Sequence, residues 1–210
     1  MNFEERFLSI RNTGNYSVIG ESVEYKIIVD HENREVILRW QQSMESADWR
    51  HNFMFLPWLL KLPYTDKVVV TTHGYACAYK STYGIPVAQF MAVAEEYKEY
   101  RKVIDGWSFG SAMAKISARH YREITKKPVD AVYTYGDVKC WFNPFLHFTY
   151  KKWAKESKEF CDCNDIVTWC VPFFWRTNTC SVGGRFSFRG ILDTEHNHQH
   201  YEECNYTKYE

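Results

Sequence analysis

The sequence predicts a single α/β domain over residues 1–210, with a mostly parallel central β-sheet flanked by helices. Two observations support this fold class. Strand-like apolar runs alternate with amphipathic helical patterns through the middle of the chain, the order expected of a parallel sheet with helical crossovers. An apolar run also enters a Gly-x-Ser-x-Gly motif at 106–110 and leaves it with helical spacing. The length is enough for one large core and short for two domains.

The individual elements follow from composition and periodicity. Strand-forming runs on either side of a turn cluster predict a hairpin near the N-terminus, and apolar residues at helical spacing predict the helices. The expected strands are 23–29, 35–40, 68–70, the run into the motif and 129–135, with late pieces at 165–167 and 185–188. The remaining expectations are helices at 86–101 and from the motif to Lys126, a short helix at 145–155, an N-terminal helix and loop extension at 1–22, and a polar tail at 204–210.

The run from Phe53 to Leu60 is almost entirely apolar. It is too short to span a bilayer, which takes roughly 18 or more apolar residues. Such a run is either buried in the core or forms a mobile apolar flap over a site. Burial is the favoured interpretation.

Charge and composition exclude several classes of protein. Lysine plus arginine equals aspartate plus glutamate at 26 each, so no bulk electrostatic attraction to nucleic acid is expected. Hydrophobic residues at 45% and charged residues at 25% are typical of a globular chain. The aromatic content of 18% suits both a core and a lipid–water boundary.

The cysteines and the first residues of the chain indicate the cellular compartment in which the protein is expected. Seven cysteines are an odd number without the spacing of a disulfide framework, which indicates a reducing environment. Residues 1–6 lack the features of an export signal, so a cytoplasmic or host-intracellular location is expected. No Cys-x-x-Cys pair is present, so no metal or other cofactor is expected at the cysteines that follow one another late in the chain: Cys161, Cys163, Cys170 and Cys180.

The Gly-x-Ser-x-Gly motif carries the candidate chemistry. Val103 and Ile104 run into it, and a small-residue helical pattern leaves it, which is the strand–turn–helix context of a nucleophile elbow. The turn holds its serine in a strained backbone conformation, and glycines two residues away avoid collision with the neighbouring strand and helix. Ser108 is therefore the candidate nucleophile.

Several motifs, taken in order over roughly residues 20–203, give the chain a resemblance to the class 3 lipase family of α/β-hydrolases. The stretch 106–114 resembles the family's Gly-His-Ser-Leu-Gly-Gly-Ala-Leu-Ala, and Asp48-Trp49-Arg50-His51-Asn52 resembles its Asp-Trp-x-x-Asn. Three further stretches are similar to Val-His-x-Gly-Phe, Val-x-Thr-Phe-Gly and Asn-x-x-Asp-Ile-Val-x-x-Leu-Pro, namely 72–75, 132–136 and 164–172.

The chain departs from the family pattern at three places. Trp107 stands where the family has histidine before the serine, and Ser111 stands where it has glycine. Gln41-Gln42 replaces Arg-Gly after the second strand of the hairpin, which bears on the geometry of the oxyanion loop.

Ester hydrolysis by a serine requires a histidine base and a carboxylate that orients it. The chain order Ser…Asp…His is that of α/β-hydrolases, and Ser108, Asp165 and a histidine of the tail satisfy it. Three rival carboxylates are less suitable: Asp137 comes too early after its strand, and Asp162 and Asp193 have the setting of solvated loop residues.

The tail offers three histidines within five residues. The resemblance favours His196, because bacterial-type members end in acidic-His-x-x-x-x-Tyr, as residues 195–201 do. Fungal-type members end in His-x-x-Tyr, which would select His198, and His200 ranks third. His73 precedes the serine and fits a structural role better.

The oxyanion of the tetrahedral intermediate requires preorganised hydrogen-bond donors. The backbone N–H of Phe109, directly after the nucleophile, is one candidate. The resemblance places Ser43 where the family has its oxyanion serine or threonine, and the alternative is an ordinary turn serine.

The sequence thus predicts a serine ester hydrolase acting on lipid acyl esters, with transient contact to a membrane or lipid interface and no nucleic-acid partner. Two other classes remain open. One is a catalytically inactive hydrolase fold used as a binding module, suggested by Trp107 and Gln41-Gln42. The other is a metal-binding interaction protein built on the late cysteines and the tail histidines. The sequence sets no expectation for oligomeric state.

Overall fold

The computed structural model describes residues 16–21, 25–40, 54–141, 153–162 and 181–183. Ser43, Asp165 and the histidines at 196, 198 and 200 lie outside the described residues, as do the late strand pieces expected at 165–167 and 185–188.

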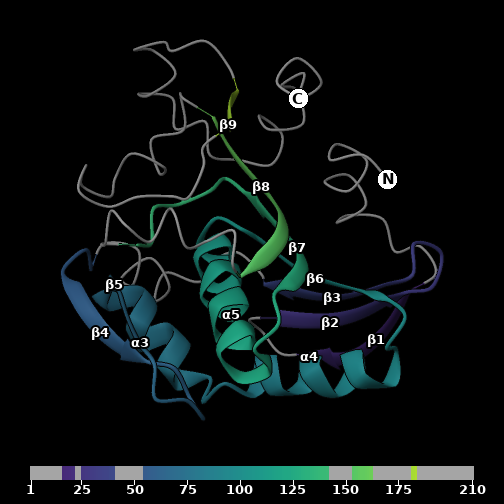
Figure 1. The fold of residues 1–210 in the computed structure, drawn as a ribbon. Coiled ribbons are helices and arrows are strands. Elements are labelled where there is room, and N and C mark those ends of the chain that lie inside the picture. The colour runs from purple at the N-terminus through teal and green to yellow at the C-terminus, as the bar shows by residue number, and fades with distance from the viewer. Residues whose placement is uncertain (1–15, 22–24, 41–53, 142–152, 163–180, 184–210) are drawn as a thin grey trace.

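Two sheets and three helices make up the described part of the chain (Figure 1). The helices are α3 (His73–Ser81), α4 (Ile85–Glu96) and α5 (Phe109–Thr125). The strands are β1 (Tyr16–Glu21), β2 (Tyr25–Asp30), β3 (Glu35–Trp40), β4 (Pro57–Lys61), β5 (Val68–Thr72), β6 (Arg101–Trp107), β7 (Val129–Tyr135), β8 (Ala154–Asp162) and β9 (Ser181–Gly183). None of these helices has the length and apolar character needed to cross a membrane.

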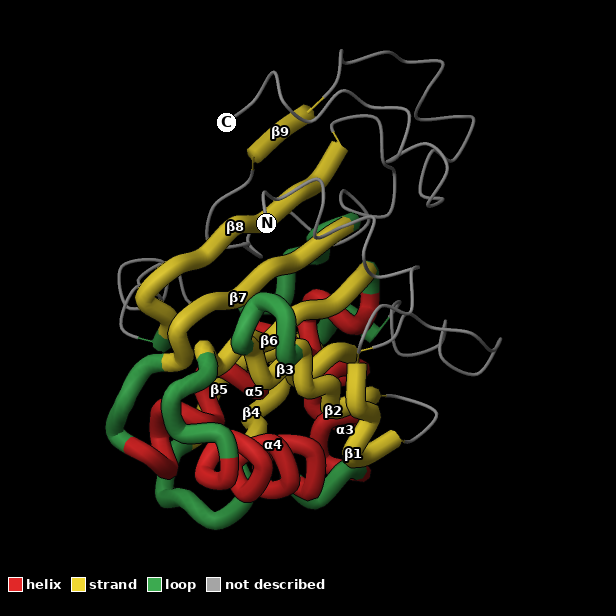
Figure 2. The backbone as a smooth tube through the Cα atoms, turned by 90° about the vertical axis from the view of Figure 1, so that its right-hand side faces the viewer, coloured by secondary structure: helices red, strands yellow, loops and turns green. Residues whose placement is uncertain are grey.

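The main sheet has the strand order β1-β2-β3-β6-β7-β8-β9, which Figure 2 shows as a ladder from bottom to top. Strands β3, β6, β7, β8 and β9 are parallel, and β1 and β2 add antiparallel pairs at one edge. The expected hairpin is confirmed, because β2 pairs with β3 from Tyr25↔Trp40 to Asp30↔Glu35. The expected mostly parallel sheet is therefore confirmed as well.

The hydrophobic core lies between the sheet and the helices. Helix α5 packs on β3, β6 and β7, while α4 packs on β2 and β3. The sheet residues on this face come from alternate positions of neighbouring strands, as the period of two requires. They include Ile27, Val29, Val36, Leu38, Ile104 and Val132, all buried.

An ion pair links β3 to β6, the strand that leads into the Gly-x-Ser-x-Gly motif. Arg39 on β3 and Asp105 on β6 are register partners. The guanidinium donates from Nε to Oδ1 at 3.0 Å and from Nη2 to Oδ2 at 2.7 Å, and Asp105 is fully buried. Because a bidentate pair of this kind fixes two strands in register, it holds the carboxyl end of β6 in place three residues before Ser108.

Strands β4 and β5 form a separate hairpin beside α3 (Figure 1). The burial favoured for the apolar run 53–60 is wrong for most of it: Leu56 is 73%, Trp58 51% and Leu59 69% exposed, whereas Leu60 is buried. The reason is topological. The hairpin stands outside the main sheet, so within β4 only Leu60 is buried, and the residues before it are exposed on both faces of the strand.

Three other expectations need correction within the described residues. Residues 16–21 form an edge strand instead of helix and loop, because pairing with β2 supplies hydrogen bonds that local composition does not reveal. The helix expected over 86–101 ends at Glu96. The helix expected over 145–155 is wrong at its end, since β8 begins at Ala154.

Candidate active site

The backbone at Ser108 has the strained geometry that the motif predicts. Ser108 lies between the last residue of β6 and the first of α5, with φ 52° and ψ −119°, and is only 6% exposed. A non-glycine residue in such a region costs about 1–3 kcal/mol and persists only where its surroundings enforce it. A strained, buried serine on a strand-to-helix turn is the nucleophile elbow expected from the sequence.

Gly106 shows what enforces the turn. A Cβ at this position would lie 2.2 Å from the carbonyl oxygen of Gly110 and 3.0 Å from the backbone nitrogen of Ser111. Two backbone hydrogen bonds hold the turn, from Ser108 N–H to the Tyr135 carbonyl and from Ser111 N–H to the Ser108 carbonyl, both 2.8 Å. The helix therefore approaches β6 so closely that only glycine fits.

The N-terminus of α5 supplies the electrostatic part of the site. Phe109 is the first residue of the helix. The first N–H groups of a helix have no acceptor within the helix, and the macrodipole adds positive potential there. The Phe109 N–H therefore lies directly after Ser108, in the positive potential at the start of α5.

Aromatic side chains enclose the elbow. Trp107, which stands where the family has histidine, stacks on Tyr135 of β7 with ring centroids 6.5 Å apart and an interplanar angle of 15°. Tyr75 of α3 meets Phe109 edge-on at 5.8 Å. Because all four residues are buried, the turn sits on a rigid aromatic base.

The serine at 111, another departure from the family pattern, has a visible partner. Its Oγ accepts a hydrogen bond of 3.1 Å from the Val138 N–H, so the first turn of α5 is tied to the segment that leaves β7. Ser111 is fully buried. The replacement of glycine is therefore accommodated by a hydrogen bond and does not displace the helix.

A buried ion pair strengthens the same connection. Lys115, one turn further along α5, lies 2.8 Å from Oδ1 and 2.9 Å from Oδ2 of Asp137 and donates to the Val138 carbonyl at 2.8 Å. Both side chains are fully buried. Asp137 thus has a structural partner in Lys115.

The charges around Lys115 reinforce its ionised form. Burial by itself lowers the pKa of an ammonium, but the negative charge of Asp137, with that of Glu159 and the hydrogen bond to Asp137, outweighs it and raises the pKa of Lys115 above its ordinary value. Burial raises the pKa of the Cys140 thiol to about 12, so this cysteine stays neutral. The group under the first turns of α5 is therefore a buried polar cluster built around the Lys115–Asp137 ion pair.

Sequence reasoning did not identify Lys115 as part of the structure behind the site. The available signal was its position, because it is the one charged residue in the otherwise small and apolar run 110–118. A charge on the buried face of a helix requires a partner. In the expected topology, Asp137 follows the strand 129–135, which makes its carboxylate a candidate partner for Lys115.

The remaining candidate site residues are outside the described part of the chain. These are Asp165, the histidines at 196, 198 and 200, and Ser43. Strand β8 lies beside β7 in parallel and ends at Asp162, three residues before Asp165 in the sequence. Among the described residues, no group of three or more His, Cys, Asp or Glu side chains is arranged to hold a metal ion.

With this geometry in view, comparison with known proteins identifies the family. The profile of class 3 lipases matches residues 37–174, which is more than half of the chain. The chain therefore belongs to the class 3 lipase family. No curated protein sequence matches it significantly.

Solved structures confirm the α/β-hydrolase fold. The chain is similar to a Rhizomucor miehei triacylglyceride lipase with a TM-score of 0.65 at 15% identity, covering 77% of this chain and 63% of that one. For MDLA from Penicillium cyclopium the TM-score is 0.62 at 18% identity, with 81% and 64% covered. For a fungal lipase–inhibitor complex the TM-score is 0.64 at 16% identity, with 74% and 60% covered. The chain thus spans less than two-thirds of the length of each.

Proposed function

We propose that this protein is a serine ester hydrolase that cleaves lipid acyl esters through an acyl-enzyme on Ser108. The observation that carries the proposal is the strained, buried Ser108 between β6 and the N-terminus of α5. Membership of the class 3 lipase family supports the same reaction. A serine held only for structure would gain nothing from a backbone strain of about 1–3 kcal/mol.

In the proposed reaction, Ser108 Oγ attacks the ester carbonyl carbon while His196 takes its proton. Asp165 would orient the imidazole and stabilise its charged form. The Phe109 N–H and Ser43 would donate hydrogen bonds to the oxyanion of the tetrahedral intermediate. Strand β8, which ends shortly before Asp165 and lies next to β7, supports a carboxylate at the same edge of the sheet as Ser108.

Collapse of this intermediate would break the bond to the leaving alcohol, which takes the proton from the imidazolium. The acyl group then remains on Ser108 Oγ. Water, deprotonated by the same histidine, would attack the acyl carbonyl, and a second collapse would release the carboxylic acid and return the proton to Ser108. No cofactor is required, because both steps are proton-coupled acyl transfers.

The exposed side of the β4–β5 hairpin supports a lipid substrate. Leu56, Trp58 and Leu59 are exposed apolar side chains in and just before β4 of this hairpin. Trp58 stacks on His73 at 4.3 Å, and His73 begins α3, the helix whose Tyr75 contacts Phe109 beside the nucleophile. Exposed apolar side chains connected in this way to the elbow suit transient contact with a membrane or lipid interface.

The test measures hydrolysis of p-nitrophenyl esters with a short and a long acyl chain, the latter with and without lipid vesicles. We expect turnover by the wild type, higher on the long chain when vesicles are present. Ser108→Ala and His196→Ala should each lose several orders of magnitude in kcat/KM, because triad members act as a unit. Exposed Ser81 provides the matched control, since Ser81→Ala should keep full activity.

The variants of the tail histidines distinguish the remaining assignments. If His196→Ala retains activity and His198→Ala loses it, the base is His198, and the same logic applies to His200. A fluorophosphonate probe should label the wild type and not Ser108→Ala. Absence of both labelling and turnover, on every ester and with vesicles present, would contradict the proposal and favour an inactive hydrolase fold that acts as a binding module.

A further inference from the structure

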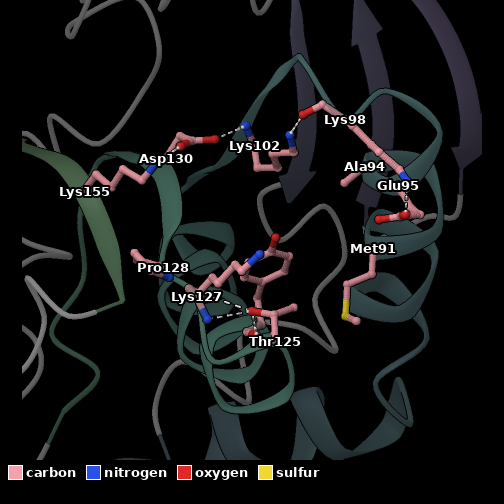
Figure 3. Close-up of a pocket in the computed structure, with 11 residues that line it drawn as sticks. Met91, Ala94, Glu95, Lys98, Lys102, Thr125, Lys127, Pro128, Asp130 and Lys155 are labelled. Carbon is pink, nitrogen blue, oxygen red and sulfur yellow. Dashed lines mark hydrogen bonds and ion pairs between the residues drawn. The ribbon is translucent and has the colours of Figure 1, made fainter.

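A cavity of about 530 Å³ lies at the end of α5 opposite to Ser108. Its walls come from α4, the start of β6, the last turns of α5, the α5–β7 turn and the starts of β7 and β8 (Figure 3). Ser108 immediately precedes α5, whose 17 residues span about 25 Å. The cavity therefore opens at the amino ends of the parallel strands, and the elbow lies at their carboxyl ends.

The cavity has an excess of positive charge. Four ammonium groups and two carboxylates line it: Lys98, Lys102, Lys127, Lys155, Glu95 and Asp130. Lys98 pairs with Glu95 and Lys155 pairs with Asp130, each at 2.6 Å. The ammonium of Lys102 donates only to the Lys98 carbonyl, and that of Lys127 has no partner among the described residues. The lining therefore carries two more positive than negative charges.

Asp130 holds the strands that line the cavity in place. One oxygen accepts a 2.8 Å hydrogen bond from the backbone N–H of Lys102, and the other accepts from the Lys155 ammonium. Burial by itself raises the pKa of Asp130, but these donors outweigh it and lower that pKa below its ordinary value. The carboxylate therefore stays ionised and ties β7 to β6 and β8, while the Lys102 side chain remains available for a ligand.

Stabilisation by helix dipoles does not account for all four lysines of the cavity. Cations near helix C-termini are stabilised by the macrodipole, which explains Lys98 after α4 and Lys127 after α5. Lys102 and Lys155, however, lie on strands β6 and β8. Figure 3 shows the Lys127 side chain running into the centre of the group.

Part of the wall is apolar. Met91 and Ala94 from α4 face Tyr121 of α5 and Pro128 of the turn across the cavity. Tyr121 is held by Phe90, with ring centroids 5.8 Å apart. A ligand with an anionic group and a small apolar body would match both the lysines and the apolar residues of the cavity.

We propose that this cavity binds a phosphate monoester carried on an apolar body. A phosphomonoester has a charge of about −1.5 to −2 near neutral pH, which matches the net excess of positive charge in the lining. Lysine binds phosphate as a point charge and does not require planar geometry. The volume lies within the range of about 300–1,000 Å³ found for small-molecule sites. The ligand is either a soluble phosphomonoester or the headgroup of an anionic lipid.

The test is calorimetric titration of the full chain with phenyl phosphate and with inorganic phosphate at low ionic strength. Phenyl phosphate should bind more tightly, because its ring contacts the apolar wall, and binding should weaken as salt increases. Lys102→Gln and Lys127→Gln should each weaken binding about tenfold, the loss of one charge-assisted hydrogen bond. Lys67→Gln, an exposed lysine of the β4–β5 hairpin, is the matched control and should bind like the wild type.

Ser108→Ala separates this inference from the proposed function, because it should abolish hydrolysis and leave phenyl phosphate binding unchanged. The proposal is overturned if neither probe shows saturable binding, or if binding is unaffected by both Lys102→Gln and Lys127→Gln. Vesicles of phosphatidylcholine with and without phosphatidic acid identify the source. Phosphatidic-acid-dependent sedimentation that is lost in Lys127→Gln indicates a lipid headgroup, and binding of phenyl phosphate alone indicates a soluble ligand.

Discussion

At its N-terminal end, α5 is held by close backbone contacts and buried charges, whereas at its C-terminal end lysines surround an open cavity. The first end leaves no room for a Cβ at Gly106 and encloses Lys115 and Asp137 completely. At the second end, Lys127 is exposed, and no carboxylate of the described residues lies within ion-pair distance of its ammonium. The difference shows that one helix can present both a rigid turn suited to chemistry and an adaptable charged surface suited to recognition.

The largest effect should come from Gly106→Ala. The new Cβ would meet the Gly110 carbonyl oxygen at 2.2 Å, a backbone atom that cannot move without displacing α5. We expect a loss of more than about 4 kcal/mol in the free energy of unfolding, or failure to fold, together with loss of any esterase activity. Urea unfolding followed by circular dichroism measures this.

The converse substitution, of Ser108 by glycine, should raise the free energy of unfolding instead of lowering it. Ser108→Gly relieves the positive φ and should stabilise the protein by about 1 kcal/mol, because relief of strain exceeds the entropy cost of glycine. A stable Gly106→Ala protein, or a Ser108→Gly protein less stable than the wild type, would mean that the turn is not sterically enforced.

The second effect compares a buried and an exposed lysine at the two ends of α5. Lys115→Met leaves Asp137 as an uncompensated buried charge and should cost about 3–4 kcal/mol. Lys127→Met should change stability by less than about 0.5 kcal/mol. Both are measured by urea unfolding at neutral pH.

A double variant tests whether the unpaired Asp137 carboxylate causes the loss of stability in Lys115→Met. Lys115→Met combined with Asp137→Asn removes both charges and should recover part of the loss, which gives a coupling energy between the two sites. If the double variant is as unstable as the sum of the single variants, the cost of Lys115→Met arises from packing and not from an unpaired carboxylate.

The third and smallest effect is the pH dependence contributed by Cys140. Its pKa is raised by burial from 9.0 to about 12, so the unfolded chain loses this proton first. The stabilising contribution is complete below pH 9 and is lost as pH rises toward 12, by about 1.4 kcal/mol per pH unit. We expect Cys140→Ala to reduce the slope of unfolding free energy between pH 9 and 10.5.

Cys77, the other free cysteine of the described residues, provides the control. It is half-buried and lies outside the polar cluster beneath α5, so Cys77→Ala controls for the loss of a thiol as such. Equal slopes for the wild type and Cys140→Ala would show that the polar cluster beneath α5 admits water.

The parts of the fold that sequence predicted well are those governed by local rules. Strands 35–40 and 129–135 have the predicted bounds, because their strand-forming residues are flanked by turn residues on at least one side. The elbow was predictable for the same reason, since Gly106, Ser108 and the helix that follows are adjacent in the chain. The requirement for glycine at position 106 depends only on contacts with Gly110 and Ser111, which are close in the sequence.

The predictions that were wrong concern partners distant in the sequence. Residues 16–21 became a strand because β2 was available to pair with them. The run Leu56–Leu59 stayed exposed because its hairpin pairs outside the main sheet. In each case a neighbour in space, which composition does not reveal, decided the conformation or the burial of the segment.

The sequence by itself determined the fold class, the elbow and the identity of the candidate nucleophile, because these follow from periodicity and from residues next to one another. Only the tertiary structure decided that Lys115 is neutralised by Asp137, that Ser111 is bonded to Val138, and that lysines from four separate elements surround one cavity. The physical reason is that burial and electrostatic pairing depend on distances between segments, which the folded sheet sets and the order of residues does not.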